Sequence, residues 1–389
     1  MTTNAERVHR EFGQSLWYDN LERGLLRSGA FRELVAAGVR GCTSNPTIFE
    51  KAIRSSSEYD SALRRLVSAG QSVEEIYYDL VIADIQAAAD VLRPIYDGSE
   101  ARDGYISVEV QPRFASDTRA TVKEALELVK RIARPNLMIK VPATEPGLEA
   151  IRTLIGQGVS VNVTLIFGVD QYRTVAEAYI AGLEQAARSG LNLARIASVA
   201  SFFVSRLDTL IDGELKERMK RKTTSADDLA RLGKLQGKAA IANAKRAYVA
   251  FGEIFSTARF TALPGAQRQR VLWASTGTKD PAYPDTLYVD ELIGPDTVDT
   301  LPPATLKAFQ DHGHPQRSVD RDVAAAEQVL NELESLGVSV PAACEKLLQA
   351  GVTSFATSLD DLFGLLGEKR AALLASGAQP GGAQPSASK

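Results

Sequence analysis

Short apolar runs alternate with longer helical stretches along nearly the whole chain, and this alternation restricts the fold more than any other feature. Apolar runs of roughly four to eight residues bounded by turn signals are typical of buried strands. A helix between each pair of strands predicts a parallel sheet, because parallel neighbours need a crossover connection. Eight segments are expected to be strands: residues 15–19, 39–43, 106–110, 137–141, 160–167, 196–201, 270–275 and 297–301.

Helix-start signals lie between these expected strands. Asn45 and Thr144 each precede a proline in the first turn of an expected helix, which is the pattern of an N-cap residue. Ser225 has an acidic residue three positions later, as in a capping box, and another helix is expected to begin near residue 357 in TSLDDLFGLL.

The chain shows no internal boundary between residues 15 and 370, since it has no composition break and no Pro/Gly-rich linker there. A length of 389 residues allows two domains or one large barrel. Eight strand–helix units in an uninterrupted segment favour the α/β fold class, as a (β/α)8 barrel. We expect residues 1–375 to form one barrel domain with C-terminal helices, and residues 376–389, which are small, polar and Pro/Gly-rich, to be a disordered tail.

Composition excludes several classes of partner. Lys and Arg number 45 against 48 for Asp and Glu, a net charge of −3, so we expect no nucleic-acid partner and no anionic membrane partner. No apolar run approaches a membrane span and the N-terminus has no signal-peptide pattern, so a cytoplasmic protein is expected. Two cysteines and three histidines without ligand spacing predict no metal site.

Polar residues interrupt the expected strands at two-residue spacing. Alternate side chains of a strand share one face, so Lys140 is expected to point into the barrel from LMIKVP. By the same alternation, Glu109 and Gln111 share a face with Ser107 in the preceding strand.

The same spacing applies to two further strands. Asn162 and Thr164 share a face in SVNVTLIF, and Asp19 shares one with Trp17 at the end of the first strand. A lysine, two carboxylates, an amide and a hydroxyl are therefore expected to converge inside the barrel, near the strand ends where barrel active sites form.

Two interpretations of this cluster are open. Lys140 and Glu109 could form a satisfied buried ion pair, although apolar replacement of such pairs is often neutral or stabilising. Alternatively, burial disfavours the charged form of an amine and leaves it free to attack a carbonyl, so that a Schiff base forms. Asp19 and Glu109 then offer two carboxylates for proton transfer at different steps.

Five motifs in this chain closely resemble the longer bacterial form of transaldolase: TSNPTIFEKAI, SVEVQPRFASDT, MIKVPATEPGLEAI, VNVTLIF and ASFFVSRLD. They occur in that family's order between residue 15 and about residue 310. The resemblance implies a class I aldolase-type barrel that needs no metal or organic cofactor. It implies transfer of a dihydroxyacetone unit from sedoheptulose 7-phosphate to glyceraldehyde 3-phosphate, giving erythrose 4-phosphate and fructose 6-phosphate in the pentose phosphate pathway.

The resemblance also implies roles for individual residues. Lys140 resembles the Schiff-base lysine, and Asp19 the acid/base that takes the C4 hydroxyl proton. Glu109 resembles the group that acts through a water, which Thr164 helps to hold. Residues that resemble contacts of the dihydroxyacetone unit or the cavity lining are Thr43, Asn45, Asn162, Ser201 and Phe203.

Phosphate binding is implied by Arg206, whose guanidinium presents paired donors. The other interpretation of Arg206 is an ion pair with Asp208 at a helix start. Shorter family members carry a second phosphate arginine after the seventh strand, but this chain has ASTGTKD there, which offers Ser275 and Lys279. Lys279 is either a second phosphate contact or a solvated loop charge.

Three functions are left to compare. Transfer is favoured over release of dihydroxyacetone, the lyase reaction of the related fructose 6-phosphate aldolases, because those enzymes usually have glutamine where this chain has Glu109. A catalytically silent scaffold is the third option. The expected partners are phosphorylated sugars, and the oligomeric state, with a homodimer as one option, is open.

Overall fold

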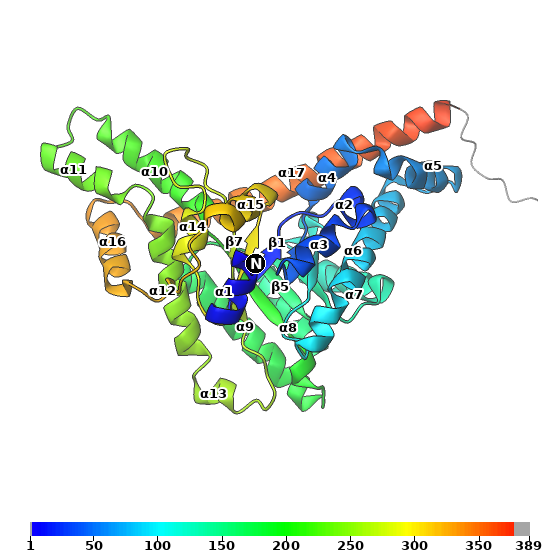
Figure 1. Ribbon diagram of the computed structural model, residues 1–389, viewed down its shortest axis with the longest axis horizontal. Helices are drawn as coiled ribbons and strands as arrows, with labels where there is room; N and C mark the ends of the chain where they lie inside the picture. The colour runs from blue at the N-terminus through cyan, green and yellow to red at the C-terminus, as the bar shows by residue number, and fades with distance from the viewer. Residues whose placement is uncertain (1, 377–389) are drawn as a thin grey trace, which may run out of the picture.

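The computed structural model describes residues 2–376, which form a closed barrel of eight parallel strands surrounded by helices (Figure 1). All eight strands lie within two residues of their expected bounds, and each pairs with its neighbours in sequence until β8 meets β1. The predicted (β/α)8 barrel is therefore confirmed. The strands are β1 Ser15–Tyr18, β2 Gly41–Thr43, β3 Ile106–Glu109, β4 Leu137–Pro142, β5 Val161–Ile166, β6 Ser198–Phe203, β7 Arg270–Ala274 and β8 Thr297–Leu301.

The helices begin largely where the capping signals predict. The side chains of Asn45, Thr144 and Ser225 each accept a hydrogen bond from a backbone N–H in the first turn that follows. The α-helices are α1 Asn4–Phe12, α2 Arg23–Ser28, α3 Ala30–Ala36, α4 Pro46–Ser55, α5 Asp60–Ser68, α6 Val73–Gly98, α7 Thr118–Ile132, α8 Glu145–Gly156, α9 Val169–Arg188, α10 Ser205–Met219, α11 Ala226–Leu235, α12 Ala239–Ile254, α13 Ala258–Thr261, α14 Leu287–Glu291, α15 Pro303–His312, α16 Val323–Ser335 and α17 Val340–Ala375. Short 3-10 turns are η1 Ser57–Tyr59, η2 Pro112–Phe114 and η3 Leu193–Arg195.

The helix start expected near residue 357 is wrong. That segment lies in the middle of α17, whose N-cap is Ser339. Buried Phe355 and Leu359 are four residues apart on one face, so the apolar stripe runs through the supposed start without a break.

Helix α17 crosses the end of the barrel at which the strands terminate. It packs against α4, α6 and α10, and in Figure 1 it spans the top of the molecule. A Cβ atom at Gly351 would lie 2.8 Å from the Leu165 side chain, so glycine permits this close approach. The Cys344 Sγ also donates to the Phe167 carbonyl at 3.1 Å. A helix far along the chain thus covers the carboxyl ends of the strands.

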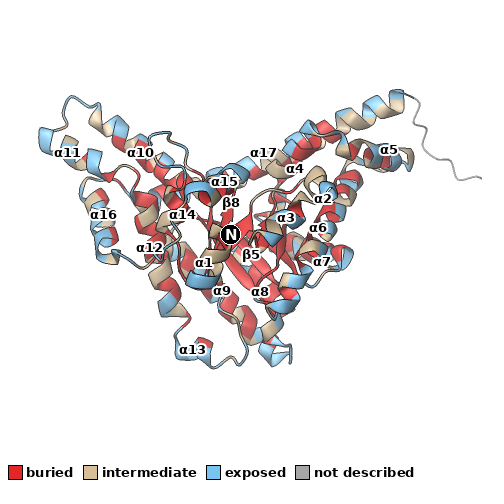
Figure 2. Cartoon of the chain, in the orientation of Figure 1, coloured by how far each residue is buried: buried red, intermediate tan, exposed pale blue. Residues whose placement is uncertain are grey.

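The core fills the barrel and the space between the strands and the helices. Figure 2 shows buried residues on the strands and on the helix faces turned toward them, with exposed residues outside. Inside the barrel, a Cβ at Gly41 would lie 2.4 Å from the Trp17 indole, so only glycine fits beside this ring. Lys140 pairs in register with Glu109 on one side and with Asn162 on the other, which sets these three at one level.

Two further findings concern the whole chain. No helix within residues 2–376 is long and apolar enough to cross a membrane. Apart from Ser376, the segment expected to be a disordered tail lies outside the described residues.

Candidate active site

Two cavities open at opposite ends of the barrel. The larger one, about 1130 Å³, lies at the N-terminal ends of the strands, and a smaller one, about 130 Å³, lies at their C-terminal ends. Barrel enzymes place their chemistry at the C-terminal end, because the loops that follow the strands meet there. Lys140 lines the smaller cavity, which is therefore the candidate active site.

Lys140 projects from β4 into the interior, as the strand alternation predicts. Its side chain is only 6% exposed, and its Nζ lies 3.4 Å from Glu109 Oε2 and 3.5 Å from the Ser44 carbonyl oxygen. The Phe355 ring lies over the amine, with 5.4 Å between Nζ and the ring centroid. The amine is therefore buried, with one carboxylate at ion-pair distance and an aromatic ring over it.

Glu109 does not behave as one half of a satisfied ion pair. Neither carboxylate oxygen has a hydrogen-bond partner of good geometry among the described residues, although Lys140 is at ion-pair distance. Burial raises the pKa of Glu109, and the charge of Lys140 only partly offsets this. The carboxylate is thus set up to bind and release a proton next to the amine.

Asp19 follows β1 at the same end of the barrel. Its Oδ1 accepts a hydrogen bond from Thr43 Oγ1 at 2.7 Å, and that hydroxyl also lies 2.6 Å from Thr300 Oγ1. Burial raises the pKa of Asp19, opposed by the Thr43 hydrogen bond and by the charge of Lys140. Asp19 lines the cavity and Glu109 lies just behind its wall, and the two carboxylates have different partners.

Hydrogen-bonding side chains lie around and beneath the lysine. Asn162 lies behind the cavity wall, where its amide donates to Ser107 Oγ at 3.0 Å and accepts from Ser201 Oγ at 2.7 Å. Asn45 lines the cavity while its Oδ1 caps α4, and the buried Thr164 Oγ1 has no protein partner among the described residues. Asn45, Ser201 and Thr164 thus offer polar atoms to a bound molecule.

Arg206 lines the same cavity at the start of α10. Its guanidinium lies 5.2 Å from the Phe203 ring centroid and 5.9 Å from that of Phe355. Within residues 2–376 it forms no ion pair, and Asp208 instead accepts hydrogen bonds from the Ala240 N–H and other groups. The ion-pair interpretation of Arg206 is therefore wrong. A partly buried guanidinium without a carboxylate is suited to an anionic group.

The segment after β7 supplies two more lining residues. Ser275 has a left-handed backbone, with φ of 58°, and its hydroxyl lies 2.9 Å from that of Ser205. Lys279 is exposed at the mouth of the cavity. Both are placed to reach a ligand that extends outward from Lys140.

Most of the residues expected at the site come together, although Gln111 does not. Gln111 lies beyond the end of β3 and donates to Glu74 Oε1 at 2.9 Å, outside the barrel, because the strand alternation ends at Glu109. Glu109 and Asn162 lie just behind the wall. The expected residues that line the cavity are Asp19, Thr43, Asn45, Lys140, Thr164, Ser201, Phe203, Arg206, Ser275 and Lys279.

Sequence reasoning missed part of the lining. Phe355 comes from α17, and no local pattern separates it from an ordinary core residue. Thr300 could have been found, because it shares a strand face with Val298 and pairs in register with Trp17. Ala274 and Pro302, at the ends of β7 and β8, complete the wall.

The fold and the cavity define a class of protein. It is a (β/α)8 barrel whose C-terminal end holds an amine, two carboxylates and a guanidinium that has no ion-pair partner among the described residues, a set suited to chemistry on a phosphorylated carbonyl compound. No group of three or more His, Cys, Asp or Glu side chains within the described residues is placed to hold a metal ion.

Comparison with known proteins identifies the family. Residues 16–366 match the model of the transaldolase/fructose-6-phosphate aldolase family. The chain is 44% identical to a transaldolase of Trichodesmium erythraeum over 95% of its own length and 98% of that protein. It is 49% identical to a transaldolase of Thermobifida fusca over 92% of its own length and 96% of the relative. The chain belongs to the transaldolase/fructose-6-phosphate aldolase family.

Proposed function

We propose that this protein is a transaldolase, which transfers a dihydroxyacetone unit from sedoheptulose 7-phosphate to glyceraldehyde 3-phosphate through a Schiff base on Lys140. The observation that carries the proposal is the buried Lys140 amine, 3.4 Å from Glu109 in an enclosed cavity. The names of the relatives support the same activity.

In the first step, the Lys140 nitrogen attacks the ketone carbon of the donor sugar, and a carbinolamine forms. Glu109 protonates the departing hydroxyl, which leaves as water, and the imine remains. The raised pKa of Glu109 supports this role, because burial favours the protonated carboxyl, which is the form that can act as an acid. Thr164 orients the water that leaves here and returns at the final hydrolysis.

In the second step, Asp19 takes the proton of the C4 hydroxyl and the bond between C3 and C4 breaks. Erythrose 4-phosphate leaves, and the electron pair of the broken bond remains on the dihydroxyacetone unit, which is now an enamine of Lys140. The enamine carbon then attacks the aldehyde of glyceraldehyde 3-phosphate, and Asp19 returns the proton to the new hydroxyl. The hydrogen bond from Thr43 supports this role, because it fixes the carboxylate toward the cavity.

Substrate binding divides between the two ends of the cavity. Asn45 and Ser201 hold the hydroxyls of the dihydroxyacetone unit, and Asn162 positions Ser201 from behind. Arg206 binds the phosphate, with Ser275 and Lys279 as outer contacts. Thr43 and Phe203 shape the wall between them.

Transfer requires that the enamine survive until the acceptor arrives, so water must be kept from productive attack. The cavity volume of about 130 Å³ and the Phe355 ring over Lys140 support such exclusion. This is the feature that favours a transferase over a lyase that releases dihydroxyacetone.

One assay separates the possible functions. With fructose 6-phosphate and erythrose 4-phosphate together, we expect sedoheptulose 7-phosphate to form much faster than free dihydroxyacetone appears with fructose 6-phosphate alone. Comparable rates would favour the lyase, and no reaction in either assay would favour a silent scaffold. Glu109→Gln tests whether Glu109 sets the balance between transfer and release, since we expect this variant to release more free dihydroxyacetone. Glu100→Gln at the other end of the barrel is the matched control variant.

The same proposal extends to the context of the enzyme. We propose that residues 1–375 act as one catalytic domain, that the protein works in the cytoplasm, and that it forms a homodimer. Light scattering of the purified full-length chain tests the homodimer, and a monomer mass would contradict it.

A further inference from the structure

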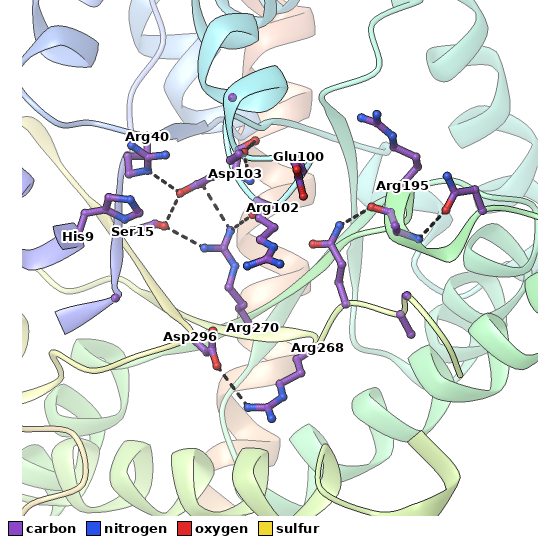
Figure 3. A pocket seen from close by; sticks show the side chains of 18 residues that line it. His9, Ser15, Arg40, Glu100, Arg102, Asp103, Arg195, Arg268, Arg270 and Asp296 are labelled. Atoms are coloured by element: carbon purple, nitrogen blue, oxygen red, sulfur yellow. Dashed lines mark hydrogen bonds and ion pairs between the residues drawn. The ribbon is translucent and has the colours of Figure 1, made fainter. Parts of the chain in front are cut away.

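A second polar cavity lies at the N-terminal end of the barrel, opposite the Lys140 cavity (Figure 3). Its volume of about 1130 Å³ exceeds the ~300–1,000 Å³ of ordinary small-molecule sites. The segments that precede the strands supply its walls, so none of the candidate active-site residues takes part. Its charged lining consists of the guanidinium groups of Arg40, Arg102, Arg195, Arg268 and Arg270 and the carboxylates of Glu100, Asp103 and Asp296.

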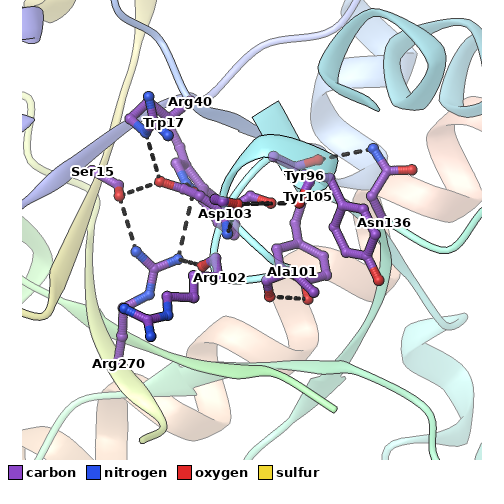
Figure 4. A network of polar contacts seen from close by, with 12 residues as sticks. Ser15, Trp17, Arg40, Tyr96, Ala101, Arg102, Asp103, Tyr105, Asn136 and Arg270 are labelled. Atoms are coloured by element: carbon purple, nitrogen blue, oxygen red, sulfur yellow. Dashed lines mark hydrogen bonds and ion pairs between the residues drawn. The ribbon is translucent and has the colours of Figure 1, made fainter. Parts of the chain in front are cut away.

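Two of these arginines have a structural partner. Asp103 is buried and accepts hydrogen bonds from Arg40 Nε and Trp17 Nε1, both at 2.9 Å, and from the Ser15 hydroxyl (Figure 4). Arg270 Nη2 lies 3.5 Å from the same carboxylate. One carboxylate thus holds two guanidinium groups, and this network ties the loops before β2 and β3 to β7.

Of the other three arginines, one forms an ion pair and two form none with any described residue. Arg268 forms an ion pair with Asp296 at 3.3 Å. Arg102 and Arg195 form no ion pair with any residue that the structure describes, although both line the cavity. The side chains of residues 2–376 therefore leave part of the positive charge of this wall without an ion-pair partner, in a chain whose net charge is −3.

Arg102 lies beside the structural network. Arg270 Nη2 donates to the Arg102 carbonyl at 2.8 Å, and Figures 3 and 4 both show the Arg102 side chain next to that of Arg270. Arg195 lines the opposite side of the cavity in Figure 3. The Arg102 and Arg195 side chains are both exposed, so their donors are available to an anion that enters the cavity from solvent.

We propose that this cavity binds a small polyphosphate-type anion, with Arg102 and Arg195 as its ligands. Guanidinium groups present paired donors that match phosphate oxygens, and several of them can share an anion with more than one phosphate. The N-terminal face of a barrel ordinarily serves stability. That role accounts for Asp103 with Arg40 and Arg270, but it leaves Arg102 and Arg195 without a function.

Inorganic pyrophosphate is the probe, and titration calorimetry measures its binding. The titration uses the full-length chain with Arg206→Ala, because Arg206 at the other end could itself bind phosphate. We expect one pyrophosphate per chain, bound more weakly as salt is raised. Adding Arg102→Ala and Arg195→Ala removes two charge-assisted contacts, so we expect at least a tenfold loss of affinity, on the order of one such hydrogen bond.

Arg188→Ala is the matched control, because this exposed arginine lies in the last turn of α9, shortly before Arg195 in the sequence, and does not line the cavity. Circular dichroism confirms that each variant is folded. Unchanged affinity in the Arg102/Arg195 variant, an equal loss in Arg188→Ala, or no binding to the Arg206→Ala chain would each overturn the proposal. A second titration uses the chain with native Arg206 and the Arg102 and Arg195 substitutions. Any pyrophosphate that this variant still binds is bound at the Lys140 end, so the two titrations together distinguish the two cavities.

Discussion

The two ends of the barrel each bury a carboxylate beside a cation, and the two carboxylates are treated in opposite ways. At the N-terminal end, burial alone would raise the pKa of Asp103, but Arg270, Arg40 and hydrogen bonds from other groups lower it below its ordinary value. At the C-terminal end, burial raises the pKa of Glu109 and Lys140 does not compensate. The difference lies in the donors, since Asp103 has several and Glu109 has none of good geometry among the described residues.

The difference in hydrogen bonding indicates that one buried carboxylate serves the stability of the barrel and the other serves its chemistry. A buried carboxylate with all its hydrogen bonds contributes to folding, whereas one without them is retained at a cost in stability. Functional sites are where such costs are found. The Asp103 network therefore stabilises the barrel, and Glu109 and Asp19 remain free to exchange protons at the Lys140 end.

The largest effect is expected from Asp103→Ala. Removing this carboxylate leaves Arg40 and Arg270 partly buried without a counter-charge, which costs roughly 3–5 kcal/mol for a broken buried pair. Urea unfolding measures the loss, and Glu100→Gln, an exposed carboxylate in the same cavity lining, is the control with no change expected. A loss below about 1 kcal/mol, the range of surface pairs, would mean that the network is not structural.

Asp19→Ala is expected to act on chemistry alone. Its task is proton transfer at the bond that breaks, so turnover falls by about 100-fold or more, as for other general acid/base groups. Imine formation does not need Asp19, and borohydride should still trap substrate on the variant. A folded variant that neither binds nor traps substrate would show that Asp19 acts earlier than proposed.

Arg206→Ala is expected to weaken phosphate binding. Loss of a charge-assisted hydrogen bond costs roughly 1.5–3 kcal/mol, so the KM for fructose 6-phosphate rises by about 10- to 150-fold. Fructose, which has no phosphate, is the control substrate, and its KM should change little. Lys279→Ala at the exposed mouth provides the matched variant with a much smaller effect. Equal changes for both substrates would assign Arg206 a structural role.

Asp299→Asn is expected to give the smallest change in stability. It tests a buried carboxylate with one hydrogen-bond donor, which lies between Asp103 with several donors and Glu109 with none of good geometry among the described residues. Asp299 in β8 is buried and accepts one hydrogen bond, from Thr276 at 2.9 Å, while its Oδ2 has no partner among the described residues. Burial raises its pKa to about 8. The folded state therefore holds a proton that the unfolded state releases, and this stabilisation is present at low pH and lost as pH rises from about 4 through about 8.

The asparagine variant does not titrate, so its stability should fall less over that pH range. Each unit of pKa shift is worth about 1.4 kcal/mol, so we expect the loss of stability from about pH 4 to about pH 8 to be smaller in the variant by at least about 1 kcal/mol. Unfolding curves at several pH values measure it. Identical slopes for both proteins would show that Asp299 does not titrate in this window.

Much of the barrel and of its catalytic interior could be predicted from the sequence because both depend on local patterns. Two-residue alternation within a strand is enough to point Lys140, Asn162 and Thr164 inward. Capping chemistry likewise fixes the starts of α4 and α8 at Asn45 and Thr144. The failure at Gln111 has the same origin, since alternation predicts a direction only while the strand continues.

The features that the sequence did not predict depend on distant packing. Phe355 reaches Lys140 only because α17 runs unbroken across the barrel, and a start signal near residue 357 suggested otherwise. The N-terminal cavity joins segments before several strands, where Arg102 and Arg195 have no periodic spacing. Such residues become neighbours through barrel closure, which no local window contains.

The central claim is that the chemistry takes place on Lys140, at the barrel end where the buried Glu109 carboxylate lacks hydrogen-bond donors of good geometry among the described residues. Trapping the covalent intermediate tests this claim most directly. Borohydride reduction in the presence of fructose 6-phosphate, followed by peptide mapping, should fix a dihydroxyacetone-derived group on Lys140. Lys140→Met should remain folded without adduct or turnover. An adduct on Lys279, or none on protein that is shown to be active, would contradict the account.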